Sequence, residues 1–291
     1  MTAKKIFALI ARILVLTILG FVTMAVASAI TPRPEFLKAI PASSNSQAAV
    51  MLLFIWFILA LIFVFILENT TLGGYRLMAL LLWVVFGVTT FVMQLETLIF
   101  ASAFPVLTTQ DVLLMVFTAL MGNLLFIPLA VFVMGKWKSA GGLMKPLFQS
   151  SSPARIALLA VIYPALYFFF GYAVAWQSSA VREFYATTTI TNNQLLLITI
   201  QIGRGVLWVL AGLPLFVMFE KRIHSVIASI LCYSLFPSIA LLLPSILMPE
   251  PVRMAHFVEI SLSMAIFGLV SGWIMTQKES VHSTRPVAQS V

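Results

Sequence analysis

The chain has 291 residues, of which 62% are hydrophobic and only 9% are charged, and its mean hydropathy is +1.09. A soluble domain carries roughly 45–50% apolar and about 25% charged residues, so this composition excludes an ordinary soluble protein. The net charge of +8 does not indicate nucleic-acid binding, because the basic residues lie at the ends of apolar segments. The single cysteine, Cys232, excludes a disulfide framework and a cysteine-ligated metal centre.

Eight apolar segments are long enough to cross a bilayer, which takes about 20 residues in a helix. Membrane barrel strands are shorter and alternate apolar with polar residues, whereas these runs are continuous. We therefore predict an all-α protein, a polytopic transmembrane helical bundle of about eight spans. The predicted spans are Ile6–Ile30, Ala48–Leu67, Leu77–Phe100, Val112–Met134, Ile156–Trp176, Leu195–Phe219, Ser225–Met248 and Ala255–Met275.

The predicted domain organisation is a single transmembrane helical domain over residues 1–275. Residues 1–134 and 156–275 are possible halves of this domain, joined by a basic cytoplasmic loop over residues 135–155. The halves show no convincing similarity to each other. Residues 276–291 form a polar tail that we predict to be cytoplasmic.

The distribution of lysine and arginine predicts the orientation of the bundle. One set of segment ends carries eleven of these residues and the other set carries four. Because basic residues accumulate in cytoplasmic loops, we predict cytoplasmic N- and C-termini in a cell membrane of the bacterial cytoplasmic type. The first segment, with Ala27-Ser28-Ala29 near its end, also resembles a secretory signal. Its length and the charge of Arg12 favour a retained helix.

Arg204 lies in the middle of the sixth predicted span. A charge at the bilayer centre costs about 2.5–3.5 kcal/mol on insertion scales, so a protein that keeps one generally uses it. With a rise of about 1.5 Å per residue, Arg204 lies roughly 5 Å outside the midplane, Glu259 about 9 Å and Glu96 about 12 Å. His256 lies slightly further out. We predict that Arg204 pairs with Glu96 or Glu259, a choice that the sequence leaves open.

Helical periodicity groups these polar residues on two faces, each about 60° wide. The sixth predicted span presents three of them on one face: Gln201, Arg204 and Trp208. The last predicted span presents three more: His256, Glu259 and Ser263. Gly268 and Gly272 lie on nearly the opposite side of that last span. Small residues at this spacing allow close helix packing, so we expect the last helix to face protein on both sides.

Six residues are candidates for ligand binding: Glu96, Gln201, Arg204, Trp208, His256 and Glu259. We expect an outward-facing polar cluster that binds or transports a small or lipid-like anionic ligand, such as a lipid headgroup, because a guanidinium suits phosphate and carboxylate. One alternative is a membrane enzyme acting on lipid-linked material, with His256 and Glu259 as an acid–base pair. Another is an assembly or accessory subunit in which a buried salt bridge only holds the helices together.

The sequence contains no zinc-protease, nucleophile-elbow or Walker A motif, and we predict neither a metal site nor a cofactor. The run from His256 to Glu259 resembles the His-Phe-x-Glu-Tyr run of VanZ-like membrane proteins, with Ile260 in place of the tyrosine. The resemblance covers only these residues, so no expectation about fold or reaction is taken from it. The sequence leaves the substrate and the oligomeric state open.

Overall fold

The computed structural model describes residues 2–39, 45–138, 146–148, 152–186 and 193–277. These residues form helices joined by short turns, with no strand among them. The helices are α1 (Ala3–Ile30), α2 (Asn45–Asn69), α3 (Gly74–Phe86), α4 (Val92–Ile99), α5 (Thr109–Val133), α6 (Ser152–Ala173), α7 (Ser179–Phe184), α8 (Gln194–Val217), α9 (Arg222–Ser238) and α10 (Glu250–Met275). A π-helical turn, η3 (Gly87–Phe91), joins α3 to α4 without a break in the span.

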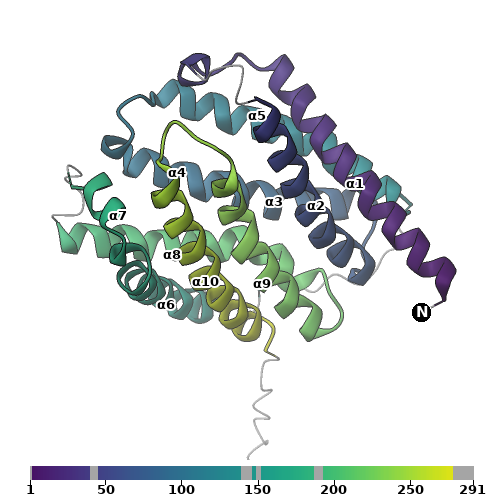
Figure 1. Ribbon diagram of the computed structural model, residues 1–291. Helices are drawn as coiled ribbons and strands as arrows, with labels where there is room; N and C mark the ends of the chain where they lie inside the picture. Colours follow the sequence, from purple (N-terminus) through teal and green to yellow (C-terminus); the bar gives the residue numbers. More distant parts are fainter. Residues whose placement is uncertain (1, 40–44, 139–145, 149–151, 187–192, 278–291) are drawn as a thin grey trace, which may run out of the picture.

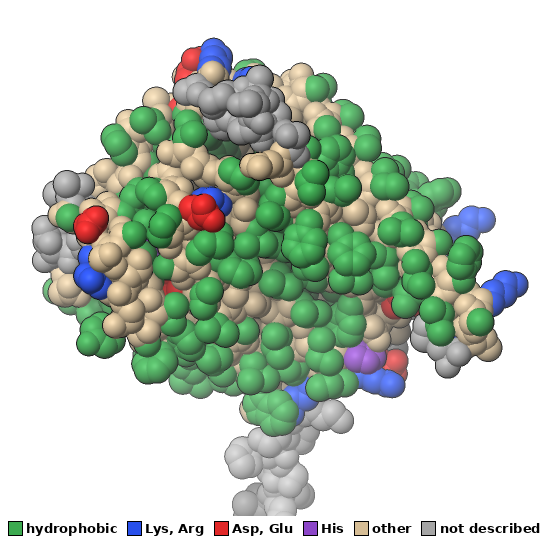
Figure 2. Space-filling model, in the orientation of Figure 1, with side chains coloured by type: hydrophobic (Ala, Val, Ile, Leu, Met, Phe, Trp, Pro, Cys, Tyr) green, Lys and Arg blue, Asp and Glu red, His purple; other side chains and the backbone are tan. Residues whose placement is uncertain are grey.

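Within the described residues, eight helical stretches are long and apolar enough to cross a membrane. The prediction of an all-α bundle with about eight spans is therefore confirmed. Hydrophobic side chains cover most of the face in Figure 2, and charged groups gather mainly toward its margins. This distribution fits a surface that is solvated by lipid along its middle and by water at its ends.

The start of α1 and the end of α10 lie on the same side of the bundle if all eight stretches cross the bilayer (Figure 1). The opposite side holds α7 and the first residues of α8 and α10, and we refer to it as the α7 end. The prediction that the α7 end faces outward rests on the sequence alone. Residues 139–145, 149–151 and 278–291, which include much of the predicted basic loop and nearly all of the tail, lie outside the described part.

The seventh span ends earlier than predicted. We expected it to reach Met248, but α9 ends at Ser238 and continues only as a 3-10 turn over Ile239–Leu242. Pro244 therefore lies outside the helix, in a segment that its missing N–H group helps to keep non-helical. The guanidinium of Arg253 donates hydrogen bonds to the carbonyl oxygen of Leu241, at 2.7 Å, and to that of Leu243. These bonds satisfy carbonyls that the end of the helix leaves free.

Close packing of α10 against α9 confirms the expected role of the last helix's glycines. A Cβ atom on Gly268 would lie 2.5 Å from the carbonyl oxygen of Ser229, and one on Gly272 would lie 2.9 Å from Cα of Val226. Only glycine allows the two backbones to approach this closely. The opposite side of α10 carries Glu259 and Ser263, which are both buried, so the helix contacts protein on both sides as predicted.

Candidate functional site

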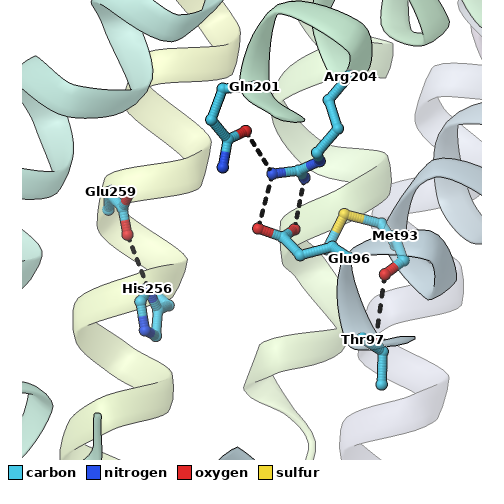
Figure 3. A network of polar contacts seen from close by, with 7 residues as sticks. All are labelled: Met93, Glu96, Thr97, Gln201, Arg204, His256 and Glu259. Atoms are coloured by element: carbon cyan, nitrogen blue, oxygen red, sulfur yellow. Dashed lines mark hydrogen bonds and ion pairs between the residues drawn. The ribbon is translucent and has the colours of Figure 1, made fainter. Parts of the chain in front are cut away.

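Arg204 on α8 forms a two-bond ion pair with Glu96 on α4 (Figure 3). Its Nη1 donates to Oε1 of Glu96 at 2.8 Å, and its Nη2 donates to Oε2 at 2.6 Å. Arg204 is 3% exposed, and the Glu96 side chain is 25% exposed. The structure therefore resolves the choice that the sequence left open, because the partner of Arg204 is Glu96 and not Glu259.

Gln201 lies one turn before Arg204 on α8 and is fully buried. Its side-chain oxygen accepts a hydrogen bond from Nη1 of Arg204, at 2.8 Å, which is the third hydrogen bond of the guanidinium. Gln201 thus binds the guanidinium through its amide oxygen. The guanidinium carbon also lies 5.6 Å from the ring centre of Tyr163 on α6, within the range of a cation–π contact. Nε of Arg204 has no hydrogen-bond partner among the described residues.

The π turn η3 lies directly before α4 and affects the direction of Glu96. Such a turn adds one residue to the helical repeat, which rotates everything after it by about 100°. The turn also lies where the helices approach closely, since a Cβ atom on Gly87 would be 2.9 Å from the Cβ of Ala211 on α8. The rotation and the close approach together bring the face of Glu96 toward Arg204.

His256 and Glu259, one turn apart on α10, form a second polar pair (Figure 3). Nδ1 of the imidazole lies 2.7 Å from Oε2 of the carboxylate, and the two side chains are 17% and 8% exposed. The imidazole and the ring of Tyr185 meet edge to face, with 5.6 Å between ring centres. Nε2 of His256 is buried and has no hydrogen-bond partner among the described residues.

Both polar pairs line one cavity of about 620 Å³. Its walls come from α4, α6, α8 and α10, together with residues of α7 and its neighbouring turns. Five of the six candidate residues contribute to the wall: Glu96, Arg204, Trp208, His256 and Glu259. Gln201 is not a lining residue and contacts the cavity wall through its bond to Arg204. Ligand cavities commonly have this size and combine an apolar wall with a few polar groups.

The cavity wall includes the end of α6 and the turn that follows it. Two of its lining residues there are exposed, Tyr172 by 73% and Trp176 by 38%. Arg204, in contrast, lies ten residues after the start of α8, which is about 15 Å along the helix axis. The cavity therefore runs from an aromatic rim to a buried ion pair at membrane depth.

The sequence analysis missed the wall that α6 contributes. Tyr163, Tyr167 and Gly171 line the cavity and are spaced by four residues, so they lie along one face of the helix. This face carries two hydroxyl groups and, at the glycine, no side chain, in an otherwise apolar span. The four-residue spacing is visible in the sequence, but a search for charged residues does not detect it. Trp208, which was predicted, lies beside this wall with its ring centre 6.4 Å from that of Tyr163.

No group of three His, Cys, Asp or Glu side chains within the described ranges is arranged to hold a metal ion. No protein-family model matches the chain, and no curated protein or solved structure is detectably similar to it. A functional proposal for this protein therefore depends on the chemistry of the cavity itself.

Proposed function

We propose that this membrane protein binds one amphipathic, lipid-like molecule in the cavity between α4, α6, α8 and α10. The polar group of the ligand lies at the two polar pairs, and its apolar part lies along the aromatic wall toward the rim at Tyr172 and Trp176. The observation that carries the proposal is the cavity of about 620 Å³ that reaches a buried, charged group at membrane depth.

A purely structural ion pair would need no cavity. Arg204 is paired as a strut would be, with three hydrogen bonds from its terminal nitrogens. The Glu96 carboxylate nevertheless lines the cavity and stays partly accessible. The attraction between the two charges would be stronger if side chains filled the space around them and kept water out. Open space beside a buried ion pair favours a binding role over a role in assembly alone.

The anionic ligand expected from the sequence is the less favoured form of this proposal. Glu96 and Gln201 already occupy three of the five N–H groups of Arg204. An anion would have to displace Glu96 or bind the N–H groups that remain. Transport of the ligand would also require a path to the opposite end of the bundle, so it stays a prediction.

A blocked cavity provides the test. A Cβ atom on Gly171 would have one near neighbour, Oε1 of Glu259 at 3.8 Å, so a phenylalanine at this position extends into the cavity. Gly203 is the matched control, because nothing lies within 4 Å of a Cβ placed there and the residue is exposed. In nanodiscs of phosphatidylcholine, phosphatidylethanolamine and phosphatidylglycerol, native mass spectrometry should show a lipid retained by the wild type and by Gly203→Phe.

The Gly171→Phe variant should lose that lipid and keep its fold by circular dichroism. Equal lipid retention by all three proteins would refute the proposal, because a lipid held outside the cavity is insensitive to residue 171. Absence of any retained lipid in the wild type would refute it as well.

The His256–Glu259 pair supports a second candidate, a membrane enzyme that acts on a lipid-linked substrate. The carboxylate holds the imidazole through Nδ1, and Nε2 is buried without a hydrogen-bond partner among the described residues. A general base needs this arrangement, with one nitrogen held and the other free. Mass spectrometry of lipids after incubation with the wild type and with His256→Gln tests this reading. It predicts a product that only the wild type forms, and chemically unchanged lipids in both samples would contradict it.

A further inference from the structure

We infer that the polar group of the ligand is a cation, a substituted ammonium held against Glu259 inside the aromatic wall of the cavity. This inference rests on the proposed function, since it assigns the charge of the ligand that the same cavity takes. It departs from the anionic ligand expected from the sequence. Four observations support it: the charge balance, the state of His256, the free oxygen of Glu259 and the aromatic wall.

The charges that line the cavity do not balance. Two carboxylates face it, Glu96 and Glu259, and the arginine that faces it is Arg204. Arg204 and Glu96 neutralise each other through two parallel hydrogen bonds, a strong and specific geometry. With a neutral imidazole at His256, one negative charge remains, and it belongs to Glu259.

We assign His256 a neutral imidazole, on the following geometry. Nδ1 lies 2.7 Å from the Glu259 carboxylate and so donates its proton there. A second proton on Nε2 would be a buried donor with no acceptor among the described residues. Such a donor costs the full desolvation of the group, so we assign the proton to Nδ1. The carboxylate then keeps its own charge.

Glu259 presents a free oxygen to the cavity. Its Oε2 accepts the hydrogen bond from His256. Its Oε1 is not among the fully buried atoms that lack a partner, so this oxygen is accessible from the cavity that Glu259 lines. The side chain is only 8% exposed, and Oε1 lies 3.8 Å from the place of a Cβ at Gly171. A carboxylate with so little exposure to solvent is costly without further donors or a positive charge. An ammonium group of a ligand in the cavity supplies that positive charge.

The cavity wall suits a cation. Tyrosine and tryptophan rings attract a positive charge through their faces, and rings grouped around a cavity recognise quaternary ammonium groups. The wall already holds one cation in this way, since the guanidinium of Arg204 lies 5.6 Å from the ring centre of Tyr163. Further rings are available around the same space, those of Tyr167, Tyr185 and Trp208.

Two amphiphiles with the same alkyl chain and opposite charges test the inference on the wild-type protein. Decyltrimethylammonium and decyl phosphate are titrated by calorimetry into nanodiscs of uncharged lipid that hold the protein. Nanodiscs that hold Gly171→Phe, whose cavity is blocked, give the heat of partitioning into the lipid. We expect the ammonium compound to bind at least about tenfold more tightly than the phosphate. Tighter binding of decyl phosphate would overturn the inference.

Two variants test whether the carboxylate of Glu259 binds the ammonium group. Glu259→Gln keeps the size of the side chain and removes its charge, so decyltrimethylammonium should bind about tenfold or more weakly. Glu68→Gln is the control, because Glu68 lies at the opposite end of the bundle in an exposed pair with Arg12, and it should leave the affinity unchanged. Unchanged affinity in Glu259→Gln would contradict the assignment of the cation to this residue.

The outcomes separate this inference from the proposed function. If neither amphiphile gives a signal beyond that of Gly171→Phe, the cavity binds no such ligand and the proposed function fails. If only decyl phosphate binds, the proposed function stands and the charge assignment fails. Choline chloride in the same titration identifies the source of the ammonium group. A response to choline indicates a free small cation, and a response to the alkylated compound alone indicates a lipid headgroup.

Discussion

Arg204 is a buried charged residue in the wall of the cavity. Its guanidinium is buried at membrane depth and bonded to Glu96 and Gln201, so the surrounding helices must keep the pair intact. Removal of one partner from such a pair leaves an uncompensated charge, which is more costly than removal of both. The value of the pair for folding can therefore be measured separately from any role in binding.

We expect Glu96→Met and Arg204→Met to destabilise the protein by about 3–5 kcal/mol each, because each leaves one buried charge unpaired. The double variant should be closer to the wild type than either single variant. Reversible unfolding in mixed micelles measures these differences. The exposed pair of Arg12 and Glu68 is the control, and its double replacement should cost no more than about 1 kcal/mol. Additive effects at Glu96 and Arg204 would show that the two charges are independent.

At the level of helices, two local features set the geometry of the site. The π turn η3 rotates α4 so that Glu96 reaches α8, and the glycines of α10 allow it to pack closely on α9 while its other face carries His256 and Glu259. Both features are backbone properties. They act on the site through the direction in which a helix presents its side chains.

Deletion of Thr89 from η3 should convert the π turn to regular α-helix and rotate Glu96 by about 100° away from Arg204. The deletion variant would then lack the ion pair. Adding Glu96→Gln to this variant should therefore cause no further loss of stability. Thr89→Ala is the control, since it keeps the chain length and should keep the effect of Glu96→Gln. A full effect of Glu96→Gln in the deletion background would show that the turn does not direct this residue.

Replacement of Gly268 by alanine should weaken the α9–α10 contact, because the new Cβ would lie 2.5 Å from the carbonyl oxygen of Ser229. A shift of the two backbones is required, and overpacking of this kind typically costs about 1–3 kcal/mol. Gly203→Ala meets open space and should be neutral or stabilising by up to about 1 kcal/mol through helix propensity. Thermal unfolding of both variants in detergent makes the comparison. Equal melting temperatures would argue against the close contact.

For the whole molecule, the orientation in the membrane decides which side of the membrane the cavity faces. The predicted cytoplasmic termini place the α7 end and the rim of the cavity on the outer side. Single introduced cysteines test this with little background, because Cys232 is fully buried. In intact cells, a membrane-impermeant maleimide should label Ser102→Cys and not Thr2→Cys. The opposite pattern would place the cavity on the cytoplasmic side.

The sequence by itself determined the class of the protein and the number of its spans. These properties depend on composition, on segment length and on the fixed rise of a helix, so they can be read from one chain without knowledge of its neighbours. Helical periodicity also placed His256, Glu259 and Ser263 on one face, and the structure shows all three along the cavity wall.

Only the tertiary structure decided which residues meet. The choice of Glu96 over Glu259 as the partner of Arg204 depends on the packing of α4 beside α8 and on the π turn that rotates α4, and neither follows from depth. The early end of α9 depends on the contacts of Arg253, which come from the next helix. The cavity itself is the space that four helices leave between them, and no local pattern in the sequence encodes the distance between helices.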